Sequence, residues 1–144
     1  MPVKALELTS VEARRFTKRD EKVRNIRIDN NSTVTLITEV NDKEANIDFR
    51  YTANYGGVGI IKIEGSLIYI GDAPALAQQW SSKNNMPDEI ASEIHTAVMR
   101  ACVPEATMIS RDLKLPPPFP LPQINIQRKD KGKGSAASSG MEIA

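Results

Sequence analysis

The chain has 144 residues, a formal net charge of +1 at pH 7 and 40% hydrophobic residues. This length suits one domain with a core of ordinary size, and the even charge balance gives no general argument for binding to nucleic acid or to a membrane surface. No apolar run is long enough to span a bilayer, and the single cysteine, Cys102, excludes an internal disulfide, so we expect a soluble, cytoplasmic protein.

The N-terminal third predicts strands joined by polar turns. Residues 3–16 alternate between apolar and polar side chains, but the phase slips by one residue near the middle, which is typical of a β-bulge. Residues 24–29 alternate again, and residues 34–40 are rich in the β-branched side chains that strands prefer. The mixed charges of residues 18–22 indicate a solvated turn.

The most regular pattern lies in residues 45–55, which alternate strictly between an apolar and a polar face. Such a strand packs one face on a core and turns the other to water, as in an antiparallel sheet. The apolar residues are Ala45, Ile47, Phe49, Tyr51, Ala53 and Tyr55. Gly56 and Gly57 then allow the chain to turn back into the next strand.

The next strand, residues 58–70, has apolar residues on both faces. One face carries Ile61, Ile63, Leu67 and Tyr69. The other face carries, at its two ends, Val58, Ile60, Ile68 and Ile70. Helices on one side of a sheet would leave this second set uncovered, so we expect another subunit, a loop or a ligand to cover it. Gly65 indicates a bulge or a close backbone approach inside the strand.

Two helices are expected downstream. Asp72 is a suitable cap for a short helix over residues 73–83, which has a proline in its first turn. A longer helix is expected over residues 87–115, because apolar side chains recur there every three or four residues. Pro104 removes one backbone hydrogen bond from it, so we expect a kink or two helices in series.

A proline-rich segment, residues 116–122, must end the long helix, and a short alternating segment, residues 124–126, follows it. Successive prolines favour an extended path. We expect this path to cross apolar surface of the same domain through Phe119 and Leu121. The alternative is that the prolines form a ligand for a small proline-binding domain; we favour packing on the protein's own core.

Residues 127–144 differ sharply in composition from the rest. They contain the basic residues Arg128, Lys129, Lys131 and Lys133, followed mainly by glycine, serine and alanine, with too few apolar residues to fold. We therefore expect an α+β domain over residues 1–126, with a mainly antiparallel sheet of four to five strands and both helices packed on one face. A disordered tail would occupy residues 127–144.

No group of residues points to catalysis, to a metal or to a cofactor. One histidine, His95, and one cysteine cannot build a common zinc site, and no serine or cysteine has a fixed neighbour that would activate it. The glycines of residues 56–59 join two strands, whereas a phosphate-binding loop opens a helix. We therefore expect a protein without enzymatic activity and without cofactors.

Contact with RNA is an alternative that the sequence leaves open. The polar face of the sheet would present Arg50 and Lys62, and the basic tail could bind phosphates without reading a base sequence. The aromatic side chains of residues 45–55 are expected on the apolar face, however, whereas stacking platforms need exposed aromatic rings.

The order of these parts resembles the export chaperone SecB and its SecB-like relatives. That family has long antiparallel strands, then a helix with a Cys-Pro pair, to which Cys102-Val103-Pro104 would correspond. A proline- and leucine-rich segment follows the family's helix and leads into a short strand. Residues 116–126 would be its counterpart here.

This resemblance implies a tetrameric holdase that keeps unfolded chains in apolar grooves between sheet and helix, without ATP. We therefore predict a polypeptide-binding protein that forms dimers or tetramers and does not insert into membranes. From periodicity, the predicted contact residues are Val58, Ile60, Ile68, Ile70, Phe119 and Leu121. The second candidate is an accessory protein of the ribosome or another ribonucleoprotein, which would use Arg50, Lys62 and the basic tail.

Overall fold

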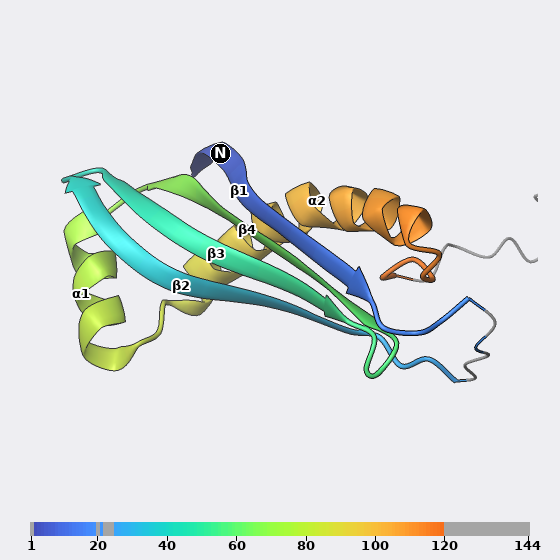
Figure 1. The fold of residues 1–144 in the computed structure, drawn as a ribbon. Helices are drawn as coiled ribbons and strands as arrows, with labels where there is room; N and C mark the ends of the chain where they lie inside the picture. The colour runs from blue at the N-terminus through green and yellow to red at the C-terminus, as the bar shows by residue number, and fades with distance from the viewer. Residues whose placement is uncertain (1, 20, 22–24, 120–144) are drawn as a thin grey trace, which may run out of the picture.

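The computed structural model describes residues 2–19, 21 and 25–119. In this part of the chain, four antiparallel strands form one sheet and two helices lie against it (Figure 1). The elements are β1 (Val3–Arg15), β2 (Asp29–Asn41), β3 (Glu44–Asn54), β4 (Gly59–Ile70), α1 (Ala73–Lys83) and α2 (Asp88–Asp112). This confirms the expected α+β class. The predicted segment 124–126 and the tail lie outside the described residues.

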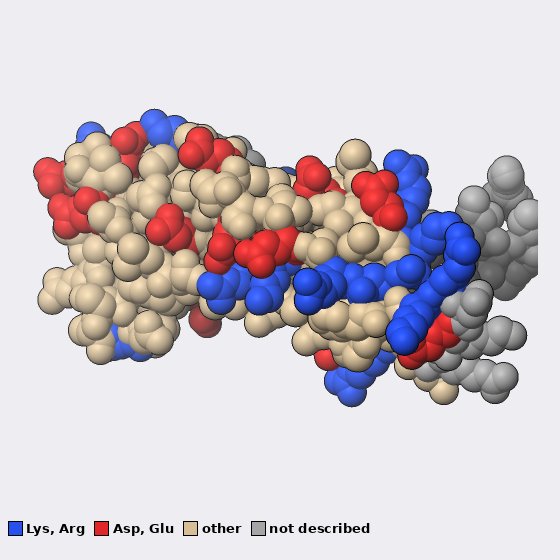
Figure 2. All heavy atoms as spheres, viewed as in Figure 1, with Lys and Arg blue, Asp and Glu red and all other residues tan. Residues whose placement is uncertain are grey.

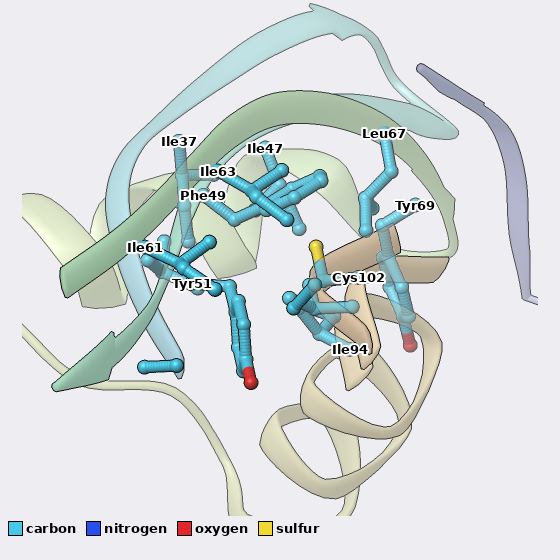
Figure 3. Packing of buried hydrophobic residues seen from close by; sticks show 14 of the residues in the cluster. Ile37, Ile47, Phe49, Tyr51, Ile61, Ile63, Leu67, Tyr69, Ile94 and Cys102 are labelled. Carbon is cyan, nitrogen blue, oxygen red and sulfur yellow. The ribbon is translucent and has the colours of Figure 1, made fainter. Parts of the chain in front are cut away.

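The strands are arranged in the order β1-β4-β3-β2, and β3 shows the alternation that its sequence predicts. The apolar side chains of β3, and Tyr55 just after its end, are each at most 1% exposed. They are Ala45, Ile47, Phe49, Tyr51, Ala53 and Tyr55. They belong to one core with the stripe of α2 made by Ile94, Val98, Cys102 and Ala106 (Figure 3). We call this side of the sheet the inner face and the opposite side the outer face.

The prediction that Val58 lies on the outer face is wrong. Val58 is only 9% exposed and belongs to the core. The chain turns just before β4, where the amide of Tyr55 donates a hydrogen bond of 2.9 Å to the carbonyl of Gly59. Because β4 begins only at Gly59, Val58 lies in the turn and does not follow the alternation of the strand.

The pairing of β1 with β4 contains two irregularities, one between Lys4 and Glu7 and one between Leu8 and Ser10. They confirm the predicted bulge. Gly65 of β4 lies opposite this stretch, and a Cβ atom there would be 2.3 Å from the carbonyl oxygen of Glu7. This is the close backbone approach expected for Gly65.

β2 also contains an irregularity, between Val34 and Leu36, which sends its apolar side chains to different faces. Val34 pairs with Phe49 on the inner face and is buried, as is Ile37. Leu36 pairs with Asp48 instead and is 50% exposed. The outer face therefore carries an apolar side chain that simple alternation would have placed in the core.

The helices confirm the predicted start of α1 and the kink in α2. The Asp72 carboxylate accepts a hydrogen bond of 3.2 Å from the amide of Ala75, and α1 packs beside β2 (Figure 1). α2 continues through Pro104 as one helix, so the alternative prediction of two helices in series is wrong. Figure 1 shows its axis changing direction along its length. Among the described residues, neither helix is long and apolar enough to cross a membrane.

Candidate functional site

β1 forms an edge of the sheet, and α2 lies close to it. Within the described residues, β1 pairs only with β4, so the backbone groups along its other side have no partner strand. At the opposite edge, α1 packs beside β2. Figure 1 shows α2 running behind the sheet and emerging beyond β1. The open edge and the helix together form two sides of a groove.

Two neighbouring depressions lie between β1 and α2, a half-open one of about 210 Å³ and a shallow, wide-open one of about 400 Å³. Both are lined by Val3, Ala97 and Arg100, and the larger one also by Leu6 and Ala101. We call the space bounded by these five residues the β1–α2 groove. Most of the exposed lining is apolar, although the charged residues Lys4, Glu93 and Arg100 also border this space.

The groove follows from the small side chains of α2. Ala97 and Ala101 are one helical turn apart and therefore lie on the same side of the helix, where they fill little space. Val3 and Leu6 of β1 are only half-buried against them. Further along β1, Val11 pairs with Ile63 of the inner face yet is 47% exposed, so apolar surface continues along this edge.

A second candidate surface lies beneath the proline-rich segment after α2, where residues 115–119 cross the inner face. We call these residues the proline strap. The hydroxyl of Tyr55 donates a hydrogen bond of 2.6 Å to the carbonyl of Pro116, and the Asn30 amide donates one of 2.9 Å to the carbonyl of Pro118. Tyr51 donates to the side-chain carbonyl of Asn30. These bonds hold the strap on the sheet.

The strap packs on the protein's own core, as expected, but through residues other than those predicted. Leu115 and Pro118 are the buried side chains. Phe119 is 38% exposed at the end of the strap, and Leu121 lies outside the described residues. A cavity of about 280 Å³ lies beside the strap and is lined partly by Met108 and Leu115.

The structure does not gather the predicted outer-face residues into one patch. Ile60 pairs with Arg14 and Asn54 near one end of the sheet. Ile68 pairs with Lys4 and Asn46 near the other end. Both are partly exposed, and Ile70, beyond Ile68, is 40% exposed. No described helix covers this face, so these residues remain candidates for contact with a partner.

The residues predicted for RNA contact lie on the same outer face. Arg50 pairs with Glu64 across β3 and β4, with 2.9 Å between guanidinium nitrogen and carboxylate oxygen, which offsets its charge. Lys62 is exposed. Figure 2 shows Lys and Arg side chains in a row on this face, next to Asp and Glu side chains. The basic residues Arg128, Lys129, Lys131 and Lys133 lie outside the described residues.

The histidine and the cysteine are both part of the packing of α2. His95 Nδ1 shares a hydrogen bond of 2.7 Å with the Ser32 hydroxyl of β2, and burial lowers the pKa of this histidine. The Cys102 thiol is buried against the inner face, and burial raises its pKa to about 11 (Figure 3). A thiol with this pKa stays protonated and is a poor nucleophile at neutral pH.

The family resemblance implied apolar grooves between sheet and helix, but the sequence did not identify the residues of the β1–α2 groove, because its two walls are some ninety residues apart in the chain. One signal was present. Ala97 and Ala101 belong to the apolar stripe of α2, where alanines leave room that larger side chains would fill. Without the position of β1, that signal does not distinguish a groove from tight packing.

Comparisons with known proteins support the fold. No protein-family model matches the sequence, and no curated protein matches it. Among solved structures, the Mycobacterium tuberculosis SecB-like chaperone Rv1957, in complex with a ChAD peptide from the Rv1956 HigA1 antitoxin, is similar with a TM-score of 0.53 and 10% sequence identity. The match covers 85% of this chain and 86% of that chain. The chain therefore has a SecB-like fold.

Proposed function

We propose that the protein is a SecB-like holdase that binds extended or non-native polypeptide without catalysis and without a cofactor. The observation that carries this proposal is the open edge of β1 beside the apolar β1–α2 groove. The SecB-like fold supports it, because the similar Mycobacterium tuberculosis chaperone is itself in complex with a peptide.

The edge strand suits a partner of any sequence. An extended chain that pairs with β1 would form main-chain hydrogen bonds, which every polypeptide can make. The bulge and the left-handed Ala5, at φ 53°, interrupt the regular edge near its start. From Ser10 to Arg15 the pairing with β4 is regular, so this stretch offers the longest uninterrupted template.

The floor of the groove suits apolar side chains of varied shape. Ala97 and Ala101 leave space, and Val3 and Leu6 supply apolar walls that are still half-exposed. Apolar side chains of a bound chain would leave water there, at about 25 cal/mol per Å² of apolar surface. Arg100 at the rim can remain in water. Non-native chains expose such side chains, whereas folded proteins bury them.

Replacement of a groove alanine by glutamate tests the proposal. Reduced, carboxymethylated lactalbumin is a suitable probe, because it stays unfolded. Ala97→Glu and Ala101→Glu should each weaken its binding by about tenfold or more, since desolvating a polar group without a partner costs about 1–3 kcal/mol and a charge costs more. Fluorescence anisotropy of the labelled probe gives the dissociation constants.

Ala75→Glu is the matched control. Ala75 is an exposed alanine of α1, away from the groove, and a glutamate in the first turn of a helix is favourable. This variant should bind the probe as wild type does and should equally delay aggregation of a heat-denatured protein. Equal binding by all three variants would show that the β1–α2 groove is not the binding site.

A further inference from the structure

The proline strap is held in the way a bound peptide would be held. The carbonyls of Pro116 and Pro118, two residues apart, accept hydrogen bonds from Tyr55 at 2.6 Å and from Asn30 at 2.9 Å. Every polypeptide has such carbonyls, and proline has no amide hydrogen to donate. The sheet therefore recognises the main chain of the strap through acceptors that any extended chain could supply.

The two donors are positioned by the sheet and not by the strap. Tyr51 donates to the side-chain carbonyl of Asn30, which fixes the orientation of that amide and directs its NH₂ group towards Pro118. Burial raises the pKa of Tyr51 and of Tyr55, so both hydroxyls stay protonated and able to donate at neutral pH.

The strap does not use all of the apolar space available to it. Leu115 and Pro118 are buried, but Phe119 is 38% exposed. The cavity of about 280 Å³ beside the strap is lined by Leu115 and by Met108, which is 56% exposed. A chain with larger apolar side chains could fill this space as well as the position of Leu115.

We propose that the surface beneath the proline strap is a second binding site for extended polypeptide, and that the strap is an internal competitor that a partner must displace. This inference rests on the proposed function and adds a way in which polypeptide binding is regulated. Carbonyls of the bound chain would accept the hydrogen bonds that Tyr55 now donates to Pro116 and Asn30 to Pro118. The apparent affinity of this site would scale with the fraction of molecules in which the strap is lifted.

Weakening the strap without removing the donors tests this inference in the full chain. Leu115→Ala removes a buried anchor and leaves Tyr55 and Asn30 intact. The apparent dissociation constant for reduced, carboxymethylated lactalbumin should fall by about tenfold if the strap is lifted ten times more often. Leu113→Ala is the control, because Leu113 is a half-buried leucine at the end of α2. It should not tighten binding.

A second variant and a second probe cover the case in which Leu115→Ala folds poorly. Pro118→Ala should also tighten binding, because it removes the buried ring and leaves the carbonyl. A labelled peptide with the sequence of residues 113–119 should bind to either strap variant and should be released by the unfolded lactalbumin.

The outcomes separate the two proposals. Equal affinity of wild type and both strap variants for lactalbumin would overturn the proposal that the strap is an internal competitor. It would leave the proposed holdase function unaffected. A strap peptide that binds but is not released by lactalbumin would also overturn the second site. Absence of lactalbumin binding in all proteins would overturn both proposals.

Discussion

The ring of Phe49 in β3 lies against the backbone of Gly65 in β4, its partner across the two strands. A Cβ atom at Gly65 would come within 2.8 Å of Phe49 Cζ and within 2.3 Å of the carbonyl oxygen of Glu7 in β1. Side-chain atoms do not approach other atoms so closely. Glycine at this position therefore allows three strands to meet at the centre of the sheet.

Gly65→Ala should destabilise the fold by about 1–3 kcal/mol, the usual cost of forcing an extra carbon into a packed core. The free energy of unfolding, measured from urea titrations followed by circular dichroism, checks this value. Gly57→Ala is the control, because nothing lies within 4 Å of a Cβ there. That variant should stay within about 0.5 kcal/mol of wild type. Equal midpoints for the two variants would contradict the packing described for Gly65.

The stability of the fold should fall in weak acid because of His95. Burial lowers the pKa of His95 from its ordinary value of 6.5, so the unfolded chain binds a proton more readily than the folded chain between these two pKa values. The stability contributed by the neutral ring is fully present above pH 6.5 and is lost as the pH falls through the folded-state pKa.

Thermal unfolding at about pH 7.5 and about pH 5 measures this effect of His95. The wild-type midpoint should fall further between these conditions than the midpoint of His95→Gln, which cannot titrate. The Ser32 hydroxyl bonded to His95 is uncharged and does not titrate in this range. If both proteins lose the same stability, another group is responsible for the pH dependence.

Cys102 should react with iodoacetamide only after the protein unfolds. Its thiol is 0% exposed and its pKa is raised to about 11, so the folded protein offers neither access nor thiolate at about pH 8. Mass spectrometry should show an unmodified native protein and complete modification in urea. Rapid alkylation of the native protein would mean that α2 separates from the sheet.

Self-association should depend on the outer face. Ile60 and Ile68 are apolar, partly exposed and covered by no described element, so a second copy of the chain is a natural partner for them. Replacing both by aspartate should convert a dimer or tetramer into monomers in light-scattering measurements. A wild-type protein that is already monomeric at high concentration would contradict this prediction.

Deletion of residues 128–144 should hardly change stability and should weaken any contact with RNA. The composition of this segment predicts that it adds little to the core, so the melting temperature should stay within about 1–2 °C of that of the full chain. The four basic residues could contribute a salt slope of at most roughly −3 to −4 to RNA binding. Unchanged RNA binding would move the contact to the outer face, near Arg50 and Lys62.

Local patterns in the sequence predicted the regular parts of the fold. The alternation of residues 45–55 identified β3 and its buried face, because successive side chains of a strand point alternately to the core and to solvent. Asp72 marked the start of α1, since its side chain caps a nearby amide. Both signals are contained within a few residues, so no long-range information was needed.

Predictions that depended on an unbroken alternation failed where the strand pattern is interrupted. Val58 was assigned to the outer face, but the turn before β4 places it in the core. The irregularity in β2 sends Leu36 outward for a similar reason. A single inserted or skipped residue reverses every later side chain. The sequence pattern located such a break in residues 3–16 but not before β4 or within β2.

The two proposed binding surfaces were the least predictable part, because each joins segments that are far apart in the chain. The β1–α2 groove needs Val3 and Ala97 side by side, and the proline strap needs Tyr55 beside Pro116. Tyr51 and Tyr55 carried one usable hint: buried tyrosine hydroxyls need hydrogen-bond partners. The partners themselves could be identified only from the fold.

Amide hydrogen exchange along β1 is the sharpest test of polypeptide binding, because an extended chain that pairs with this edge strand would protect its amides. With saturating reduced, carboxymethylated lactalbumin, the exchange rates of β1 amides should fall by about tenfold or more. Amides of β2, the other edge strand, should keep their rates. Unchanged exchange in β1, together with new protection elsewhere on the sheet, would show that polypeptide does not bind along this edge.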